Sequence, residues 1–284
     1  MVAPTAILQL ICPDRPGLVS ELSGWVSANG GNIRHADHHT DSGAGLFLSR
    51  LEWDLEGFGL PRSSLPEAVH ALSARLGGEG QLHFSDQQSR VALFVSKQDH
   101  CLLDLLWRTR AGELPMQVSL VISNHPDLRA IAEDFGARFE LVPVSAASKQ
   151  QAEQRQLELL EEEGIDLAVL AKYMQVLSGD FLRRFSPVIN IHHSFLPAFT
   201  GAQPYHRAWE RGVKLIGATA HYVTEELDAG PIIEQATVHV SHRDEVHDLI
   251  RKGRDMERLA LARALRQHLH HQVMVYRGRT AVFD

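Results

Sequence analysis

The stretch Phe185-Ser-Pro-Val-Ile189, continued by Asn190-Ile-His-His-Ser-Phe-Leu-Pro-Ala-Phe-Thr-Gly201, joins an apolar run to side chains that are costly to bury. An apolar run of this length bounded by polar residues is typical of a buried strand. Polar groups at the carboxyl end of a parallel strand lie where open α/β sheets bind their ligands. The stretch therefore predicts a parallel α/β sheet with a ligand site at the end of this strand.

A second strand-like run, Leu215–Val223, leads to the turn Leu227-Asp-Ala-Gly-Pro231. Because side chains alternate along a strand, Asn190 and His192 project to the same face. Together with Asp228 they offer an amide, an imidazole and a carboxylate, which suffice for acid–base and oxyanion chemistry without a cofactor. A single histidine at a strand end is more often a structural polar group, so the prediction of catalysis depends on the three side chains together.

Outward from this stretch, strands alternate with helices, which predicts a doubly wound, mostly parallel sheet. The predicted strands are Val91–Val95, Gln117–Ile122, Phe139–Val142 and Asp166–Leu170, and the predicted helices are Cys101–Arg108, Leu128–Phe135 and Gln150–Glu163. Beyond the turn, the capping pattern Ser241-His-Arg-Asp244 predicts a long helix. Gly253 weakens the case for its continuity.

The first 85 residues follow a βαββαβ order, which is typical of ferredoxin-like α+β domains. The predicted strands are Ala6–Ile11, Asn32–His39, Leu46–Trp53 and Gln81–Phe84, and the predicted helices are Leu18–Ala28 and Leu65–Leu76. Residues 86–90 are polar, as expected of a linker. We therefore expect three parts: a small domain over 1–85, a linker over 86–90 and a larger domain over 91–284.

The composition excludes several classes of protein. A formal net charge of -7 over 284 residues argues against a nucleic-acid binder, because phosphate binding requires a basic face. The two cysteines, Cys12 and Cys101, form no Cys-x-x-Cys pair, which fits free thiols in a reducing cytoplasm. No run approaches the roughly 20 apolar residues that span a bilayer, so we expect no membrane partner.

Several ligand-binding signatures are absent from the sequence. The larger domain has neither Gly-x-x-x-x-Gly-Lys nor Gly-x-Gly-x-x-Gly after a strand, which argues against ATP and NAD. His-Glu-x-x-His is also missing, so we expect no metal site. His35, His38 and His39 cluster near Asp37, but they fall in a predicted polar strand and are more simply read as solvated.

The motifs of the larger domain resemble the formyltransferase family that handles 10-formyltetrahydrofolate. The resemblance is carried by Asn190-Ile-His192, Ser194-Phe-Leu-Pro197, Gly201, Leu227-Asp-Ala-Gly-Pro231 and Leu170-Ala-Lys-Tyr-Met-Gln-Val-Leu177. Other features resemble its hydrolytic branch, the formyltetrahydrofolate deformylases: Val95-Ser-Lys-Gln-Asp-His-Cys-Leu102, the doubled His192-His193, Gly201-Ala-Gln-Pro-Tyr205, Gly217-Ala-Thr-Ala-His-Tyr-Val223 and the extra N-terminal domain.

This resemblance implies hydrolysis of 10-formyltetrahydrofolate to formate and tetrahydrofolate, which balances one-carbon pools and supplies formate for purine synthesis. It implies no cofactor besides the folate substrate. The implied catalytic residues are Asn190, His192 and Asp228, and the implied substrate-binding residues are Tyr173, Met174, Gln175, Val176, Leu177, His193 and His221. The alternatives are a transferase that passes the formyl group to an amine, and a non-catalytic amino-acid sensor. Whether His192 or Asp228 is the base stays open.

The turns Cys12-Pro-Asp-Arg-Pro-Gly-Leu18 and Asn29-Gly-Gly-Asn-Ile33 resemble those of ACT domains, small modules that often bind an amino acid. The resemblance implies glycine or methionine as effector and a homo-oligomer, either a dimer or a tetramer. The candidate regulatory residues are Asp14, Arg15, Gly17, Gly30 and Asn32. A purely assembling role is the alternative.

Two further expectations concern the folate site. Lys172, Arg207 and Lys214 are candidates to meet the glutamate tail of the folate. The aromatic side chains of Phe195, Phe199, Tyr205 and Trp209 are candidates to fill the place of an amine acceptor.

Overall fold

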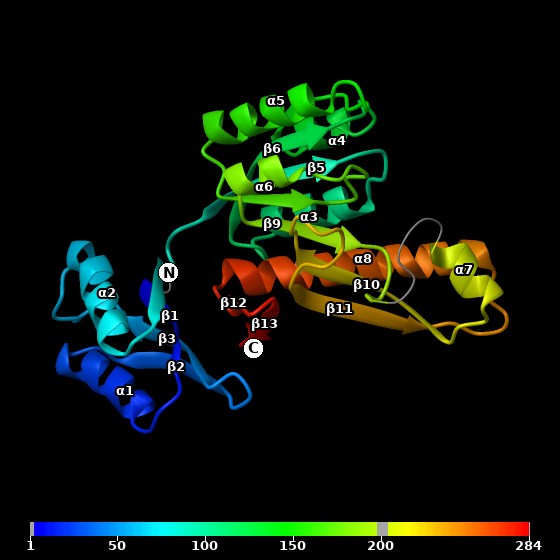
Figure 1. Ribbon diagram of the computed structural model, residues 1–284. Helices are drawn as coiled ribbons and strands as arrows, with labels where there is room; N and C mark the ends of the chain where they lie inside the picture. Colours follow the sequence, from blue (N-terminus) through cyan, green and yellow to red (C-terminus); the bar gives the residue numbers. More distant parts are fainter. Residues whose placement is uncertain (1–2, 198–203, 284) are drawn as a thin grey trace. The chain divides into compact units, whose positions relative to one another are not determined.

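The computed structural model describes residues 3–197 and 204–283, and the chain divides into two compact units (Figure 1). The first unit comprises the residues up to Gln88 together with two C-terminal segments, His270–Tyr276 and residues 281–284. The second comprises Ser89–Leu269 and Arg277–Thr280. No helix among the described residues is long and apolar enough to cross a membrane.

The first unit has the predicted ferredoxin-like fold. Its elements are β1 (Thr5–Pro13), α1 (Leu18–Ala28), β2 (Ile33–Asp41), β3 (Leu46–Asp54), a 3-10 turn (Arg62–Ser64), α2 (Leu65–Arg75) and β4 (Glu79–Phe84). The strands form one sheet in the order β2-β3-β1-β4, with antiparallel neighbours. Leu8 and Leu10 of β1 pack with Leu22 of α1 and Val69 of α2 in a buried core. The α+β prediction for this region is therefore confirmed.

The opposite face of this sheet is covered by the C-terminal segment, which contains the strands β12 (Val273–Tyr276) and β13 (Arg279–Val282). Ile11, Leu46 and Leu48 pack there against Met274 and Phe283. Gln9 donates to the carbonyl oxygens of His271 and Val273, both at 3.0 Å. Successive side chains of a strand point to opposite faces of the sheet, and here both faces carry apolar side chains. Both faces are therefore covered by other parts of the chain. We expected all of residues 91–284 to form the larger domain, but residues 270–276 and 281–284 belong to the first unit.

The second unit is the predicted α/β sheet. Its elements are β5 (Ser89–Val95), α3 (His100–Arg110), β6 (Met116–Ser123), α4 (Arg129–Asp134), β7 (Arg138–Leu141), α5 (Lys149–Glu162), β8 (Leu167–Leu170), α6 (Gly179–Arg184), β9 (Val188–His192), α7 (Pro204–Glu210), β10 (Leu215–Tyr222), β11 (Ile232–His239) and α8 (Val246–Leu269). The strand order is β11-β10-β9-β8-β5-β6-β7. The five strands from β9 to β7 are parallel, and β10 runs antiparallel to both of its neighbours, β9 and β11.

The structure differs from the sequence expectations at three places in this unit. Ser89 and Arg90 belong to β5, because they pair with Met116 and Gln117 of β6, so the expected linker 86–90 is shorter. The Asp244 carboxylate accepts from the Ser241 amide at 2.7 Å, but in a turn that precedes α8. Gly253 lies inside α8, which is continuous.

Candidate active site

A cavity of about 570 Å³ opens at the carboxyl ends of β8 and β9, where parallel sheets bind ligands. Its volume is in the range of small-molecule sites. The ten residues that the family resemblance assigns to catalysis and substrate binding all line it: Asn190, His192, Asp228, Tyr173, Met174, Gln175, Val176, Leu177, His193 and His221. The structure thus brings together three sequence segments that are far apart in the chain.

A larger cavity of about 790 Å³ lies along α5 and α6. Its charged side chains pair with one another near the surface, as Arg155 does with Glu158. None of the described residues that line it is a histidine. The smaller cavity is therefore the candidate active site.

His192, at the end of β9, is oriented by Asp228. Its Nδ1 atom lies 3.2 Å from Oδ1 of Asp228. Asp228 has a φ of 55°, which is uncommon for a residue other than glycine. Two residues later, a Cβ on Gly230 would lie 1.8 Å from the carbonyl oxygen of Tyr222, so only glycine allows this turn to approach β10. The Gly-Pro turn thus sets the position of the carboxylate.

Asn190 is held by His221. The backbone register of β10 against β11 shifts between Ala220 and His221, and such irregularities re-aim side chains. Nδ1 of His221 lies 2.9 Å from the carbonyl oxygen of Tyr222, which can only accept, so Nδ1 carries the proton. Nε2 of neutral His221 then accepts from Nδ2 of Asn190 at 3.2 Å. One amide hydrogen of Asn190 remains for a ligand.

Burial favours the uncharged form of the imidazoles in the site. It lowers the pKa of His192, against the opposing effect of Asp228, and Lys172 and His221 lower it further. Burial also lowers the pKa of His221. For His193, burial and then the charge of Lys172 lower the pKa to about 4. Nε2 of His192 is buried without a hydrogen-bond partner among the described residues, which leaves it available to a water or a substrate atom.

The segment 173–177 forms another wall of the cavity. Met174 and Val176 are largely exposed, while Tyr173 is buried and its hydroxyl accepts from Gln156 at 2.9 Å. Tyr173 therefore contributes its ring, because its hydroxyl is already bonded within the core. Burial raises the pKa of that hydroxyl to about 12.

Two of the sequence expectations about side chains need correction. Lys172 is buried and forms an ion pair with Glu257 at 3.2 Å, so in this structure it is not available to a glutamate tail. Phe195, Tyr205 and Trp209 do not line the cavity, and the hydroxyl of Tyr205 donates to Glu257. Phe199 and Gly201 lie outside the described residues.

Thr219 and Gln235, which sequence analysis did not single out, support the loop after β9. The hydroxyl of Thr219 donates to the carbonyl oxygen of Ser194 and accepts from the amide of Leu196. Nε2 of Gln235 donates to the carbonyl oxygen of Leu196 and to Thr219, both at 3.0 Å. A threonine between two alanines in an apolar strand was the available signal, because a buried hydroxyl requires partners.

The candidate regulatory residues of the first unit do not form one cluster. Asp14, Arg15 and Gly17 precede α1, whereas Gly30 and Asn32 follow it. An 11-residue helix is about 16 Å long. Arg15 pairs with Glu21 at 2.5 Å, and Asn32 donates to Asp54 at 2.9 Å. The two turns are therefore separate features.

Comparison with known proteins agrees with this architecture. Residues 89–265 match the formyl transferase family. A formyltetrahydrofolate deformylase from Synechocystis is 58% identical over 98% of both chains. The crystal structure of a formyltetrahydrofolate deformylase from Pseudomonas syringae pv. tomato has a TM-score of 0.97, with 44% identity, and covers 100% of this chain and 96% of that one.

A more distant relative lacks a counterpart for part of the chain. The crystal structure of glycinamide ribonucleotide transformylase 1 from Symbiobacterium toebii has a TM-score of 0.65 and 32% identity. The match covers 98% of that chain but 72% of this one. The whole-length similarity is thus to the deformylases, and the chain belongs to the formyltetrahydrofolate deformylase family.

Proposed function

We propose that the chain hydrolyses 10-formyltetrahydrofolate to formate and tetrahydrofolate. The observation that carries this proposal is the position of His192, whose Nδ1 faces Asp228 at 3.2 Å while its buried Nε2 has no partner among the described residues. An imidazole fixed at one nitrogen and free at the other can transfer a proton at the free nitrogen. Full-length similarity to deformylases identifies the donor of the formyl group.

The reaction requires one base, one oxyanion donor and one acid. A water held at Nε2 of His192 loses a proton to that nitrogen as its oxygen attacks the formyl carbon. The formyl oxygen becomes an oxyanion, which accepts from the amide hydrogen of Asn190 that His221 leaves free. When the tetrahedral intermediate collapses, the C–N bond breaks and the imidazolium of His192 returns its proton to N10.

We assign His192 as the base and Asp228 as the group that orients it. Burial favours neutral His192, and a neutral imidazole accepts a proton. The carboxylate of Asp228 then stabilises the imidazolium that forms during the reaction, as a carboxylate does in a catalytic triad.

The proposed reaction uses no cofactor and no metal. Amide, imidazole and carboxylate supply the proton transfers and the oxyanion contact. Dialysis against a strong chelator should leave formate release unchanged. A loss of activity that added zinc restores would contradict this part of the proposal.

The alternatives differ in the acceptor of the formyl group. In a hydrolase, formate should appear in equal amount with tetrahydrofolate when no amine is present. Glycinamide ribonucleotide should neither accept the formyl group nor accelerate its loss. Formylated glycinamide ribonucleotide as the main product would favour the transferase, and no product of either kind would favour the non-catalytic sensor.

We further propose that the first unit senses an amino acid, with glycine and methionine as candidates, and that the enzyme is a cytoplasmic homo-oligomer. The ferredoxin-like fold and the two glycine-rich turns beside α1 support a sensing role. If an effector changes folate affinity, folate must change effector affinity by the same factor. Calorimetry that shows no binding of either amino acid would favour an assembling role instead.

A further inference from the structure

Lys172 follows β8 in a backbone conformation that lysine rarely adopts. Its φ is 65°, and its side chain is 6% exposed. Glycine accepts this conformation without a steric cost, whereas other residues hold it only where the surroundings enforce it. Lys172 also lines the candidate active site, so the contacts that hold a buried lysine in this conformation need to be identified.

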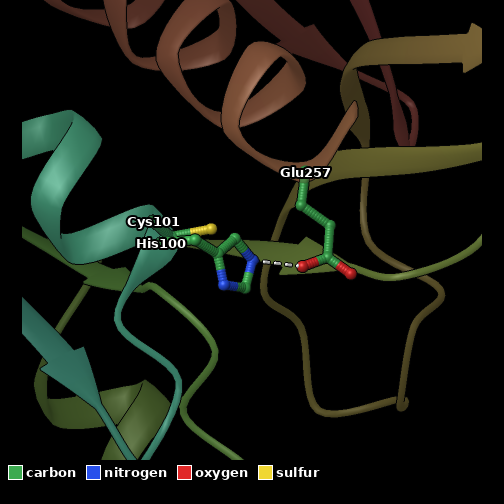
Figure 2. Close-up of side chains that lie close together, drawn as sticks. All are labelled: His100, Cys101 and Glu257. Carbon is green, nitrogen blue, oxygen red and sulfur yellow. Dashed lines mark hydrogen bonds and ion pairs between the residues drawn. The ribbon is translucent and has the colours of Figure 1, made fainter. Parts of the chain in front are cut away.

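The ammonium group of Lys172 is held in place by Glu257 of α8. Oε1 of Glu257 lies 3.2 Å from Nζ of Lys172 and accepts from the hydroxyl of Tyr205 at 3.0 Å. Oε2 lies 2.6 Å from Nε2 of His100, and Figure 2 shows the ring directed at the carboxylate. Burial raises the pKa of Glu257, but the bond from His100 and the charge of Lys172 outweigh it and lower that pKa to about 2. Glu257 is therefore a buried anion with three partners.

The helix itself is shaped for this arrangement. A Cβ on residue 253 would lie 2.0 Å from the hydroxyl oxygen of Tyr205. Gly253 therefore leaves room for the tyrosine to reach Glu257, one turn further along α8. Gly253, which weakened the prediction of a continuous helix, thus allows Tyr205 to donate its hydrogen bond to Glu257.

The same carboxylate also belongs to a group that resembles a metal site. Within the described part of the chain, His100, Cys101 and Glu257 are the group of potential metal ligands whose donor atoms lie within 4.8 Å of one another (Figure 2). Lys172 already neutralises the carboxylate, and burial raises the pKa of the Cys101 thiol. A cation would have to displace the ammonium group from the carboxylate and a proton from the thiol. The cluster is better explained as the anchor of Lys172.

Lys172 lines the same cavity as His192 and His193, whose rings stack with centroids 4.8 Å apart. Lys172, Glu257 and Asp228 act on both imidazoles, while His221 acts on His192 and His192 acts on His193. Lys172 lines the cavity and Glu257 does not, so the positive member of the ion pair is the one that borders the two rings, where it opposes their protonation. Its net influence therefore favours neutral imidazoles.

We propose that Lys172 is a positioning residue of the hydrolytic reaction: its ammonium group, fixed by Glu257 at the cavity wall, keeps His192 and His193 uncharged and so holds His192 ready to accept a proton from water. This inference rests on the proposed function. It assigns Glu257, His100 and Tyr205 the task of holding that charge in place.

The test is the pH dependence of kcat in Lys172→Met, which removes the charge and keeps most of the length of the side chain. The pH below which kcat falls should rise by on the order of one unit, the usual size of a pKa shift caused by one nearby charge. The rate should recover toward the wild-type value at high pH. Lys172→Arg, which keeps the charge, should hold that pH near its wild-type value. Lys252→Met removes a partly exposed lysine of α8, which pairs with Asp244 in the preceding turn, and should change nothing.

A second measurement does not depend on turnover. Labelled histidine rings can be titrated by NMR, and His192 and His193 should protonate at higher pH in Lys172→Met than in the wild type. If that variant does not fold, Lys172→Met combined with Glu257→Gln leaves no unpaired charge and should show a smaller upward shift. An equal loss of rate at every pH, with unchanged histidine titration, would overturn the inference. Wild-type protein that releases no formate would instead overturn the proposed function, and the titration would still test Lys172.

Discussion

Nδ1 of His192 lies 3.2 Å from Oδ1 of Asp228, although one residue ends β9 and the other lies in the turn between β10 and β11. The contact fixes the ring and directs its other nitrogen away from the carboxylate. Because both residues line the same cavity, the pair is available to a bound substrate.

Asp228→Asn tests this pair. The substitution preserves shape but removes the charge that stabilises the imidazolium, so kcat should fall about 10²–10⁴-fold, the usual contribution of acid–base catalysis. Folate affinity should change little, because the segment 173–177 is untouched. The matched control is Asp180→Asn, an exposed position on α6, which should retain wild-type kcat. Activity of Asp228→Asn within a few-fold of wild type would remove Asp228 from the mechanism.

His221 should act through Asn190. In His221→Phe the amide of Asn190 loses its acceptor, and a buried donor without a partner costs about 1–3 kcal/mol. We expect kcat to drop by roughly tenfold or more, since 1.4 kcal/mol corresponds to a factor of ten. His221→Gln supplies a side-chain oxygen that can accept from Asn190 and should retain more activity. Equal kcat values for the two variants would contradict the proposed contact.

Gly230→Ala should displace the turn that carries Asp228. The new Cβ would lie 1.8 Å from the carbonyl oxygen of Tyr222, and backbone shifts forced by such crowding typically cost about 1–3 kcal/mol. Urea unfolding and kcat should both reveal the loss. Gly24→Ala, in α1, meets no atom within 4 Å and should be neutral or stabilising. Wild-type stability and activity in Gly230→Ala would show that the turn is not constrained.

The buried imidazoles predict a loss of stability in acid. Burial lowers the pKa of His192, His193 and His221 in the folded chain, whereas unfolded histidine has a pKa of about 6.5. Between these values the unfolded chain binds more protons, so stability falls as pH drops below about 6.5. For His193, whose folded pKa is about 4, the loss is on the order of 3 kcal/mol.

Urea unfolding between pH 7 and pH 4.5 measures this effect. His193→Gln does not titrate in this range and should reduce the slope of stability against pH. Exposed His247 provides the control, because His247→Gln should leave the slope unchanged. The same slope in wild type and His193→Gln would show that His193 is not a buried neutral group.

The sequence was most informative where local pattern determines structure. The alternation of strands and helices placed β5 to β9, and the position of polar residues after β9 placed Asn190 and His192 in the cavity. The position of β12 and β13 was not predictable, because it depends on the second apolar face of a sheet formed by residues 5–84. Local periodicity does not reveal which distant segment covers such a face.

Contacts between side chains that are distant in the sequence could not be predicted either. Lys172 and Glu257 are 85 positions apart, and nothing in the local sequence distinguishes a buried ion pair from two solvated charges. Gly253 similarly suggested an interrupted helix, whereas its absent side chain makes room for Tyr205. His221 was recognised as a site residue, but its bond to Asn190 depends on the register of β9 and β10, in which these two residues pair.

The most direct test of the account is a turnover of 10-formyltetrahydrofolate in water enriched in oxygen-18, without an amine acceptor. If water held by His192 attacks the formyl carbon, each formate released should contain one oxygen atom from the solvent, and His192→Gln should slow its appearance about 10²–10⁴-fold. Unlabelled formate, or labelled formate released at the wild-type rate by His192→Gln, would contradict the account.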